Sequence, residues 1–203
     1  MAASRLIAID PSLTCSGWAL FSLKTKKLLG VGKIRSMPPA LALAERLDDL
    51  QRKVCRVFDE LALAADDILI CESPTAVLDP GGAFKVERVR GIFEVVARER
   101  GIRVPGRINP RTVQREIMGL KGKQISRTQV KQTAVEVVYR LYGSELGKLG
   151  LVSNGSKELH RHQDIVDAVL VGSLGLVKIG AAQAAGVMLQ ELLEGGNMRR
   201  RVA

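Results

Sequence analysis

Four acidic residues stand where a divalent cation site would need them. Asp10 and Glu72 each end a short apolar run, and Asp164 and Asp167 are three residues apart, so they share one face at the start of a helix. Clustered carboxylates repel one another unless a cation lies among them. Because oxygen ligands favour Mg²⁺ or Mn²⁺ over zinc, the sequence predicts such a metal site if folding brings the four together.

Each acidic residue also has an ordinary structural explanation. Asp10 precedes a turn that contains Pro11 and Gly17, and aspartate is a common turn residue. Glu72 precedes a Ser-Pro pair and can simply terminate a strand. The two later aspartates suit the first turn of a helix, where the helix dipole favours negative charge. The metal interpretation therefore depends on the elements that carry these residues.

The hydrophobic pattern predicts these elements. Apolar residues spaced by three and four predict a helix over 41–63. Strands are expected at 6–10, 18–21, 28–36, 68–72 and 101–108, and further helices at 81–100, at 125–143 and from about 162, with a mobile loop over 144–157. Gly180 is expected to separate a main domain, residues 1–179, from a C-terminal helix and basic tail, residues 180–203.

The composition indicates one sizeable core and a polyanionic partner. The 203 residues are 46% hydrophobic, and 31 Lys and Arg against 21 Asp and Glu give a net charge of +10, which favours nucleic acid over an anionic membrane surface. Cys15, Cys55 and Cys71 are scattered and form no metal-binding pair, as expected for free thiols in a reducing compartment. We expect no signal peptide, no apolar stretch of about 18 residues and a cytoplasmic protein.

Five segments resemble, in order, the motifs of the RuvC family of Holliday-junction resolvases. They are IAIDPSLTCSGWAL, ILICESPTAV, GAFKVERVRGIFEVVARERGIRV, SRTQVKQTAV and HRHQDIVDAVLVG, within residues 6–177. The resemblance implies an α/β, RNase H-like fold with a mixed five-stranded sheet flanked by helices. It also implies an endonuclease that resolves four-way DNA junctions by paired symmetric nicks.

The resemblance assigns the four acids as catalytic metal ligands. Asp10, Glu72, Asp164 and Asp167 would hold two Mg²⁺ or Mn²⁺ ions about 4 Å apart, which hydrolyse a phosphodiester and leave a 5′ phosphate and a 3′ hydroxyl. His160 and His162 precede the last pair of acids. Either histidine could orient the attacking water or the scissile phosphate, or be an ordinary surface residue.

The resemblance also indicates how branched DNA and a second subunit would bind. Where the family often has an aromatic residue that contacts an unpaired base, this chain has Thr75, and Phe84 is the nearest aromatic. Gln114 replaces one of the family's basic residues. A homodimer would form through residues 84–100, by way of Val86, Val89, Phe93 and Val96, unless these four face the monomer core. The candidate DNA-binding basic residues, which a solvated loop would equally explain, are Arg111, Arg115, Lys121, Lys123, Arg127 and Lys131.

Two other functions agree with parts of the pattern. A branched-DNA or flap endonuclease of phage type would keep the four acids but differ at Thr75 and Gln114. A nucleotide-binding protein of the actin or sugar-kinase type shares the Asp-turn-hairpin opening, but it needs a second glycine-rich phosphate loop that is not evident here. A catalytically silent relative is disfavoured because all four acids are present.

Overall fold

The computed structural model describes residues 4–73, 80–121, 125–153 and 155–198 and contains one mixed sheet. Its five strands lie in the order β3-β2-β1-β4-β5, with β1, β2 and β3 antiparallel and β4 and β5 parallel to β1. The strands are β1 Arg5–Asp10, β2 Cys15–Ser22, β3 Leu28–Arg35, β4 Ile68–Glu72 and β5 Arg107–Ile108. The predicted five-stranded α/β architecture is confirmed.

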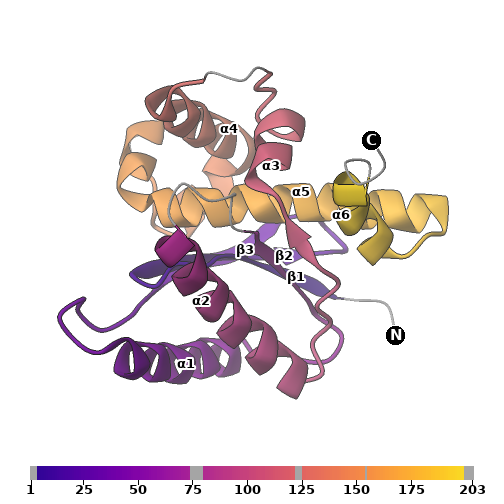
Figure 1. The fold of residues 1–203 in the computed structure, drawn as a ribbon. Helices are drawn as coiled ribbons and strands as arrows, with labels where there is room; N and C mark the ends of the chain where they lie inside the picture. Colours follow the sequence, from indigo (N-terminus) through magenta and orange to yellow (C-terminus); the bar gives the residue numbers. More distant parts are fainter. Residues whose placement is uncertain (1–3, 74–79, 122–124, 154, 199–203) are drawn as a thin grey trace.

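Helices cover both faces of this sheet. α1 and α2 lie on one face, while α5 crosses the other, with α3 and α4 beyond it and α6 against its C-terminal part (Figure 1). The helices are α1 Leu43–Glu60, α2 Pro80–Glu99, α3 Pro110–Glu116, α4 Arg127–Lys148, α5 Gln163–Ala185 and α6 Leu189–Met198, and a 3₁₀ helix, η1, spans Ser156–His162.

The alternation of side chains along β1 and β4 divides the core in two and sets the direction of both strand-terminal acids. Leu6 and Ala8 pack on the α5 side, whereas Ile7 and Ile9 pack on the side of α1 and α2. In β4, residues 68 and 70 belong to the α5 side. Since side chains alternate between faces, Asp10 and Glu72 both face α5.

α5 is the most apolar of the long helices. The helical stretch Ser156–Ala185 is long and apolar enough to cross a membrane by length and composition, so the expectation that no such stretch exists is wrong. However, 72% of its apolar window is buried inside the protein. Because α5 packs across β1 and β2, its apolar character is explained by its place in the core.

Several element boundaries differ from those predicted. α5 continues through Gly180 and ends at Gly186, which adopts the left-handed conformation typical of helix ends, so the predicted break at residue 180 is wrong. Residues 144–148 extend α4, and residues 156–157 open η1, so the predicted loop over 144–157 is shorter. Packing stabilises the added turns of α4 and α5, although both helices contain glycines.

The region from 101 to 121 contains less strand and more helix than expected. β5 has two residues, preceded by a single bridge between Ile68 and Arg103. Residues 110–116, expected to be a basic loop, form α3. Asn109 caps this helix by accepting a hydrogen bond from the Arg111 amide at 2.8 Å, and Pro110 occupies its first turn.

The apolar face of α2 is covered within the monomer. Val89, Phe93 and Val96 are fully buried with residues of α1, and the rings of Phe93 and Phe58 lie 6.4 Å apart. The expectation that these three residues join two subunits is therefore wrong, and Val86 is only half-buried. The predicted apolar face of α2 is present, but it packs against α1 and not against a second subunit.

The N-terminus of α5 rests directly on β2 at Gly17. A Cβ at this position would overlap the main-chain carbonyl of Asp164 and crowd the amide of Ile165. Both obstacles are backbone atoms, which cannot rotate away as a side chain can. Gly17 therefore permits the close approach that brings Asp164 to the sheet.

We expect Gly17→Ala to lower the free energy of unfolding by about 1–3 kcal/mol, the usual cost of overpacking a core, and to weaken Mg²⁺ binding because α5 must shift. Denaturant unfolding and calorimetric Mg²⁺ titration measure the two effects. Gly91→Ala in α2 is the matched control, since a Cβ there meets no atom within 4 Å. A Gly17→Ala protein as stable as the wild type would contradict the assigned packing.

Candidate active site

Three residues form a row across the sheet beneath the start of α5. Asp10 in β1 pairs with Gly17 in β2, and Gly17 pairs with Lys33 in β3. Directly opposed residues project to the same face of a sheet, so Asp10 and Lys33 flank the position where the Asp164 carbonyl lies over Gly17. An acid and a base of the sheet thus border the first turn of α5.

The structure brings the four predicted acidic side chains into mutual electrostatic range. The Asp10 and Glu72 carboxyl groups interact with each other, and Asp10 also interacts with Asp164. Asp167 interacts with Asp10 and Asp164, and Glu72 interacts with Asp167. Residues from two strands and one helix, from Asp10 to Asp167, therefore form one acidic cluster.

Burial is the main reason that this cluster resists ionisation. It raises the pKa of Asp10 to about 6 and, together with repulsion from Asp10 and Asp164, raises the pKa of Asp167 to about 7. Burial and the charge of Asp10 also raise the pKa of Glu72 well above its usual value. The repulsion between the two strand-terminal carboxylates therefore adds to the effect of burial at Glu72.

The donor set has the chemistry of a site for a hard divalent cation. It consists of carboxylate oxygens, and a cation among them would relieve the repulsion that raises the pKa of Glu72. In the described part of the chain, no group of three or more His, Cys, Asp or Glu side chains is arranged to hold a metal ion. The acids match the metal in type and sign of charge, and their role as ligands stays a prediction.

The two predicted histidines lie at different distances from the acids. His160 is exposed on η1. His162 is partly buried next to the N-terminus of α5, and its Nδ1 has no hydrogen-bond partner among the described residues. Burial lowers the pKa of His162, and the charges of Lys33 and Arg161 lower it further, while Asp164 raises it. His162 is therefore the histidine that belongs to the acidic cluster.

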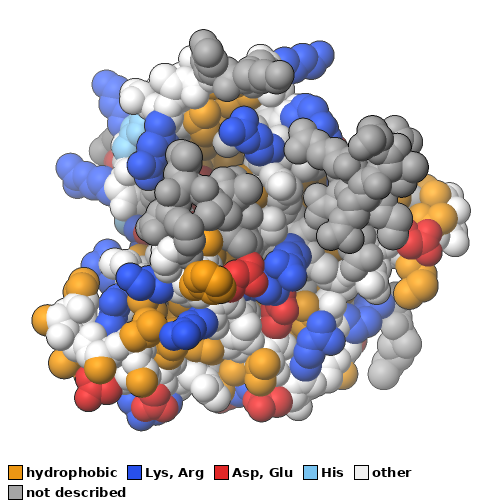
Figure 2. Space-filling model, in the orientation of Figure 1, with side chains coloured by type: hydrophobic (Ala, Val, Ile, Leu, Met, Phe, Trp, Pro, Cys, Tyr) orange, Lys and Arg blue, Asp and Glu red, His pale blue; other side chains and the backbone are white. Residues whose placement is uncertain are grey.

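The predicted DNA-binding residues are mostly exposed. Lys131, in the first turns of α4, acts electrostatically on Asp167 and so lies near the acids. On the side of the molecule drawn in Figure 2, Lys and Arg side chains lie over the region of α3 and α4. Thr75 and Lys123 lie outside the described residues. The exposed members of the set are Phe84, which is 70% exposed, Arg111, Arg115, which pairs with Glu116, Lys121, Arg127 and Lys131.

Lys33 was not among the predicted site residues. Its Nζ lies 3.1 Å from an Asp164 carboxylate oxygen. No local pattern pointed to it, because its face of β3 is known only from the packing of Val31, two residues away, against the α5-side core. A lysine on the covered face of a strand needs a partner for its charge.

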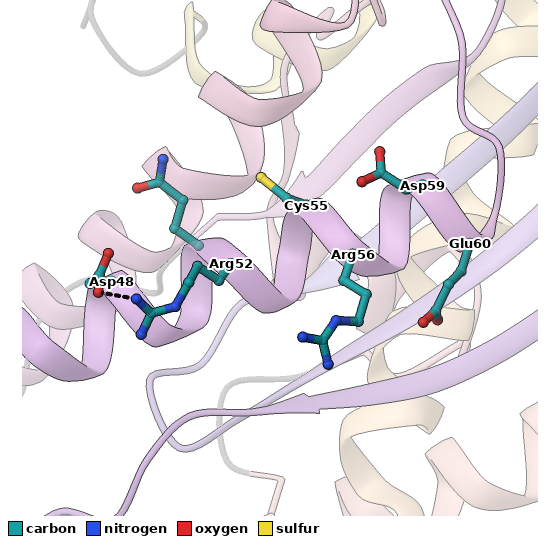
Figure 3. A pocket seen from close by; sticks show the side chains of 7 residues that line it. Asp48, Arg52, Cys55, Arg56, Asp59 and Glu60 are labelled. Carbon is teal, nitrogen blue, oxygen red and sulfur yellow. Dashed lines mark ion pairs between the residues drawn. The ribbon is translucent and has the colours of Figure 1, made fainter.

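Two surface pockets lie away from the acids. One, of about 490 Å³, runs along α1 and is lined by Asp48, Gln51, Arg52, Cys55, Arg56, Asp59 and Glu60 (Figure 3). It lies on the helix that packs against the opposite face of the sheet. The other, of about 880 Å³, lies between the start of β4 and the turn joining α5 to α6, whereas Glu72 is at the other end of β4.

No known family model matches the chain. A crossover junction endodeoxyribonuclease RuvC from Azorhizobium caulinodans is 28% identical over 116 residues, which are 57% of this chain and 66% of that protein. The protein of the same name from Rhodopseudomonas palustris is 29% identical over 116 residues, 57% of this chain and 64% of that protein. The chain thus matches slightly less than two thirds of the length of these relatives.

The comparison with solved structures also points to RuvC. A Thermus thermophilus RuvC in complex with Holliday junction substrate superposes with a TM-score of 0.56 at 17% identity, over 95% of this chain and 94% of that one. The chain resembles RuvC. A second T. thermophilus RuvC structure gives 0.53 at 19% identity, over 85% of this chain and 97% of that one. The predicted resemblance to RuvC and the predicted fold are therefore confirmed.

The raised pKa values predict how the metal-free protein responds to pH. The acids contribute most to stability while protonated, below about pH 4, and this contribution is lost as the pH rises through about 6 for Asp10 and about 7 for Asp167. In EDTA, the thermal midpoint should fall between pH 5 and pH 8. Mg²⁺ should raise the midpoint more at pH 8, where it no longer competes with protons.

Asp167→Asn is the control for this titration, because it removes one of the shifted groups without changing the size of the side chain. Its midpoint in EDTA should fall less between pH 5 and pH 8 than that of the wild type. Identical pH profiles for the two proteins would contradict the assignment of the shift to this cluster.

Proposed function

We propose that the chain is a metal-dependent, structure-specific endodeoxyribonuclease that resolves four-way DNA junctions by paired symmetric nicks. The observation that carries this proposal is the meeting of Asp10 and Glu72, from two strand ends, with Asp164 and Asp167 of α5 in one partly buried acidic cluster. The support from relatives is that they are named crossover junction endodeoxyribonucleases. The products carry a 5′ phosphate and a 3′ hydroxyl.

The four acids would hold the catalytic metal. Two Mg²⁺ or Mn²⁺ ions, when bound, supply an activated water and stabilise the leaving 3′ oxygen. Asp10 lies at the end of the central strand β1 and is the natural shared ligand, with Glu72 on one side and the α5 aspartates on the other. Because carboxylates bind a cation in their charged form, the raised pKa values of these acids would make cation binding weaker at low pH.

DNA would be held by charge and positioned by the surface around the acids. The net charge of +10 attracts the phosphate backbone, and Lys131 lies close enough to Asp167 to act on it electrostatically. Phe84, exposed at the start of α2, is the aromatic available to stack on an unpaired base. These residues would bind branched and linear DNA alike, so cleavage rather than binding carries the specificity.

Two symmetric nicks require two active sites of the same kind, which a two-fold homodimer provides. Since Val89, Phe93 and Val96 are buried within the monomer, the contact would involve other residues of α2, of which Phe84 and Val95 are exposed.

A cytoplasmic location agrees with free thiols, and in this compartment the enzyme would act in DNA recombination and repair.

A branched-DNA or flap endonuclease is the second candidate. The observation that favours it is the sequence difference at Thr75 and Gln114, which would alter recognition of the junction and leave the four acids unchanged.

A comparison of substrates separates the two candidates. With Mg²⁺ or Mn²⁺, the protein should cut a mobile four-way junction in two strands, symmetrically about the crossover, and leave nicks that DNA ligase can seal. Linear duplex of the same sequence should be cut far more slowly, because it does not present two scissile phosphates at the spacing of a dimer. Faster cutting of flaps or three-way forks, without paired nicks, would replace the resolvase by the second candidate.

Asp10→Asn tests the chemistry independently of the substrate. The change removes a carboxylate ligand but adds no bulk, so cleavage should fall by at least about 100-fold while binding to the junction in a gel-shift assay is kept. Cleavage at the wild-type rate in Mg²⁺ would show that the acidic cluster is not the catalytic centre.

A further inference from the structure

Lys33 pairs directly with the acidic cluster. Its Nζ lies 3.1 Å from Asp164 Oδ2 and donates a hydrogen bond of 3.2 Å to the main-chain carbonyl of Arg161. Among the described residues, it forms the only salt bridge to any of the four acids. The ammonium therefore joins β3 to both the end of η1 and the first turn of α5.

An ordinary role for a lysine on β3 would be protection of the sheet edge, since β3 is an edge strand. Such a lysine extends into solvent. The Lys33 side chain is only 16% exposed, and it belongs to the face of the sheet that α5 covers. Edge protection does not explain this burial, whereas the two contacts at the N-terminus of α5 do.

A second side chain of the sheet interacts with the same carboxylate. The Cys15 thiol, on the neighbouring strand β2, interacts electrostatically with Asp164 and Lys33. Asp164 is therefore paired with β3 through Lys33, and its main chain lies against Gly17 of β2. The orientation of this acid is set by the sheet that also carries Asp10 and Glu72.

We propose that Lys33 is a positioning residue, which anchors Asp164 and the first turn of α5 on the sheet beside the other three acids and so prepares the site for a divalent cation. The inference rests on the proposed nuclease function. Metal affinity is sensitive to groups that orient the ligands, and losing one such group typically costs about 10–100-fold. Lys33 would act through Asp164 and would not itself contact the reacting phosphate.

The test replaces Lys33 and compares metal binding with cleavage. Lys33→Met keeps most of the side-chain length and removes the charge and both contacts, whereas Lys33→Arg keeps a charged donor. Lys53→Met is the matched control, because Lys53 likewise contacts one carboxylate, Asp49 at 2.8 Å, and one carbonyl, that of Arg35 at 2.9 Å, but on α1. Mg²⁺ binding without DNA is measured by calorimetry, junction binding in EDTA by gel shift, and cleavage as a function of Mg²⁺ concentration.

Lys33→Met should weaken Mg²⁺ binding by about 10-fold or more and shift the Mg²⁺ dependence of cleavage by a similar factor, with junction binding in EDTA unchanged. Lys33→Arg should restore most of the affinity, and Lys53→Met should change neither quantity. If Lys33→Met does not fold, Lys33→Gln, which keeps a donor for the Arg161 carbonyl, is measured in its place.

Unchanged Mg²⁺ binding in Lys33→Met would overturn the inference, and so would tighter binding, which would mean that the ammonium competes with the metal. An equal loss of Mg²⁺ affinity in Lys53→Met would mean that the effect comes from removing any positive charge and not from the position of Lys33. If the wild type cuts branched DNA and Lys33→Met behaves identically, only the role of Lys33 is disproved. A wild type that neither binds Mg²⁺ nor cuts DNA removes the proposed function as well.

Discussion

The close contact between α5 and the sheet is the constraint on which the acidic cluster depends. At Gly17 and Gly172 an added Cβ would overlap the Asp164 carbonyl and the Phe21 ring, respectively, so the helix lies flat on β1 and β2 only because these positions carry no side chain. Interiors this closely packed do not absorb an extra carbon without movement. The distance between the helix-borne and strand-borne acids therefore follows from packing, not from any attraction between them.

Electrostatics opposes the arrangement that packing imposes. Asp10 and Glu72 occupy the last positions of strands whose other residues are apolar, and burial raises the pKa of each. A fold selected only for stability would not place Asp10, Glu72 and Asp167 together, because each of these three is more costly to ionise than in water. A divalent cation would offset part of this cost. This electrostatic cost is confined to the site where a metal-dependent reaction would take place.

The two faces of the sheet have different tasks. The face covered by α1 and α2 is closed by apolar packing, including Phe58 and Phe93, and carries none of the four acids. The other face is covered by α5, with α3 and α4 beyond it, and its acids lie at the edge where the strands end. One face therefore stabilises the sheet, while the other holds the groups that would bind metal and DNA.

The sequence by itself determined the strands and main helices, the four acids and the resemblance to RuvC, because these depend on local apolar periodicity and on motifs read in order. It also predicted that Asp10 and Glu72 would meet, since both end strands of one sheet. Only the tertiary structure decided that Val89, Phe93 and Val96 face α1, because one apolar stripe serves a core and an interface equally well. Likewise, Lys33 and Gly17 became meaningful only once β2 and β3 were in register beneath the start of α5, a relation between residues that are distant in the chain and that no local pattern encodes.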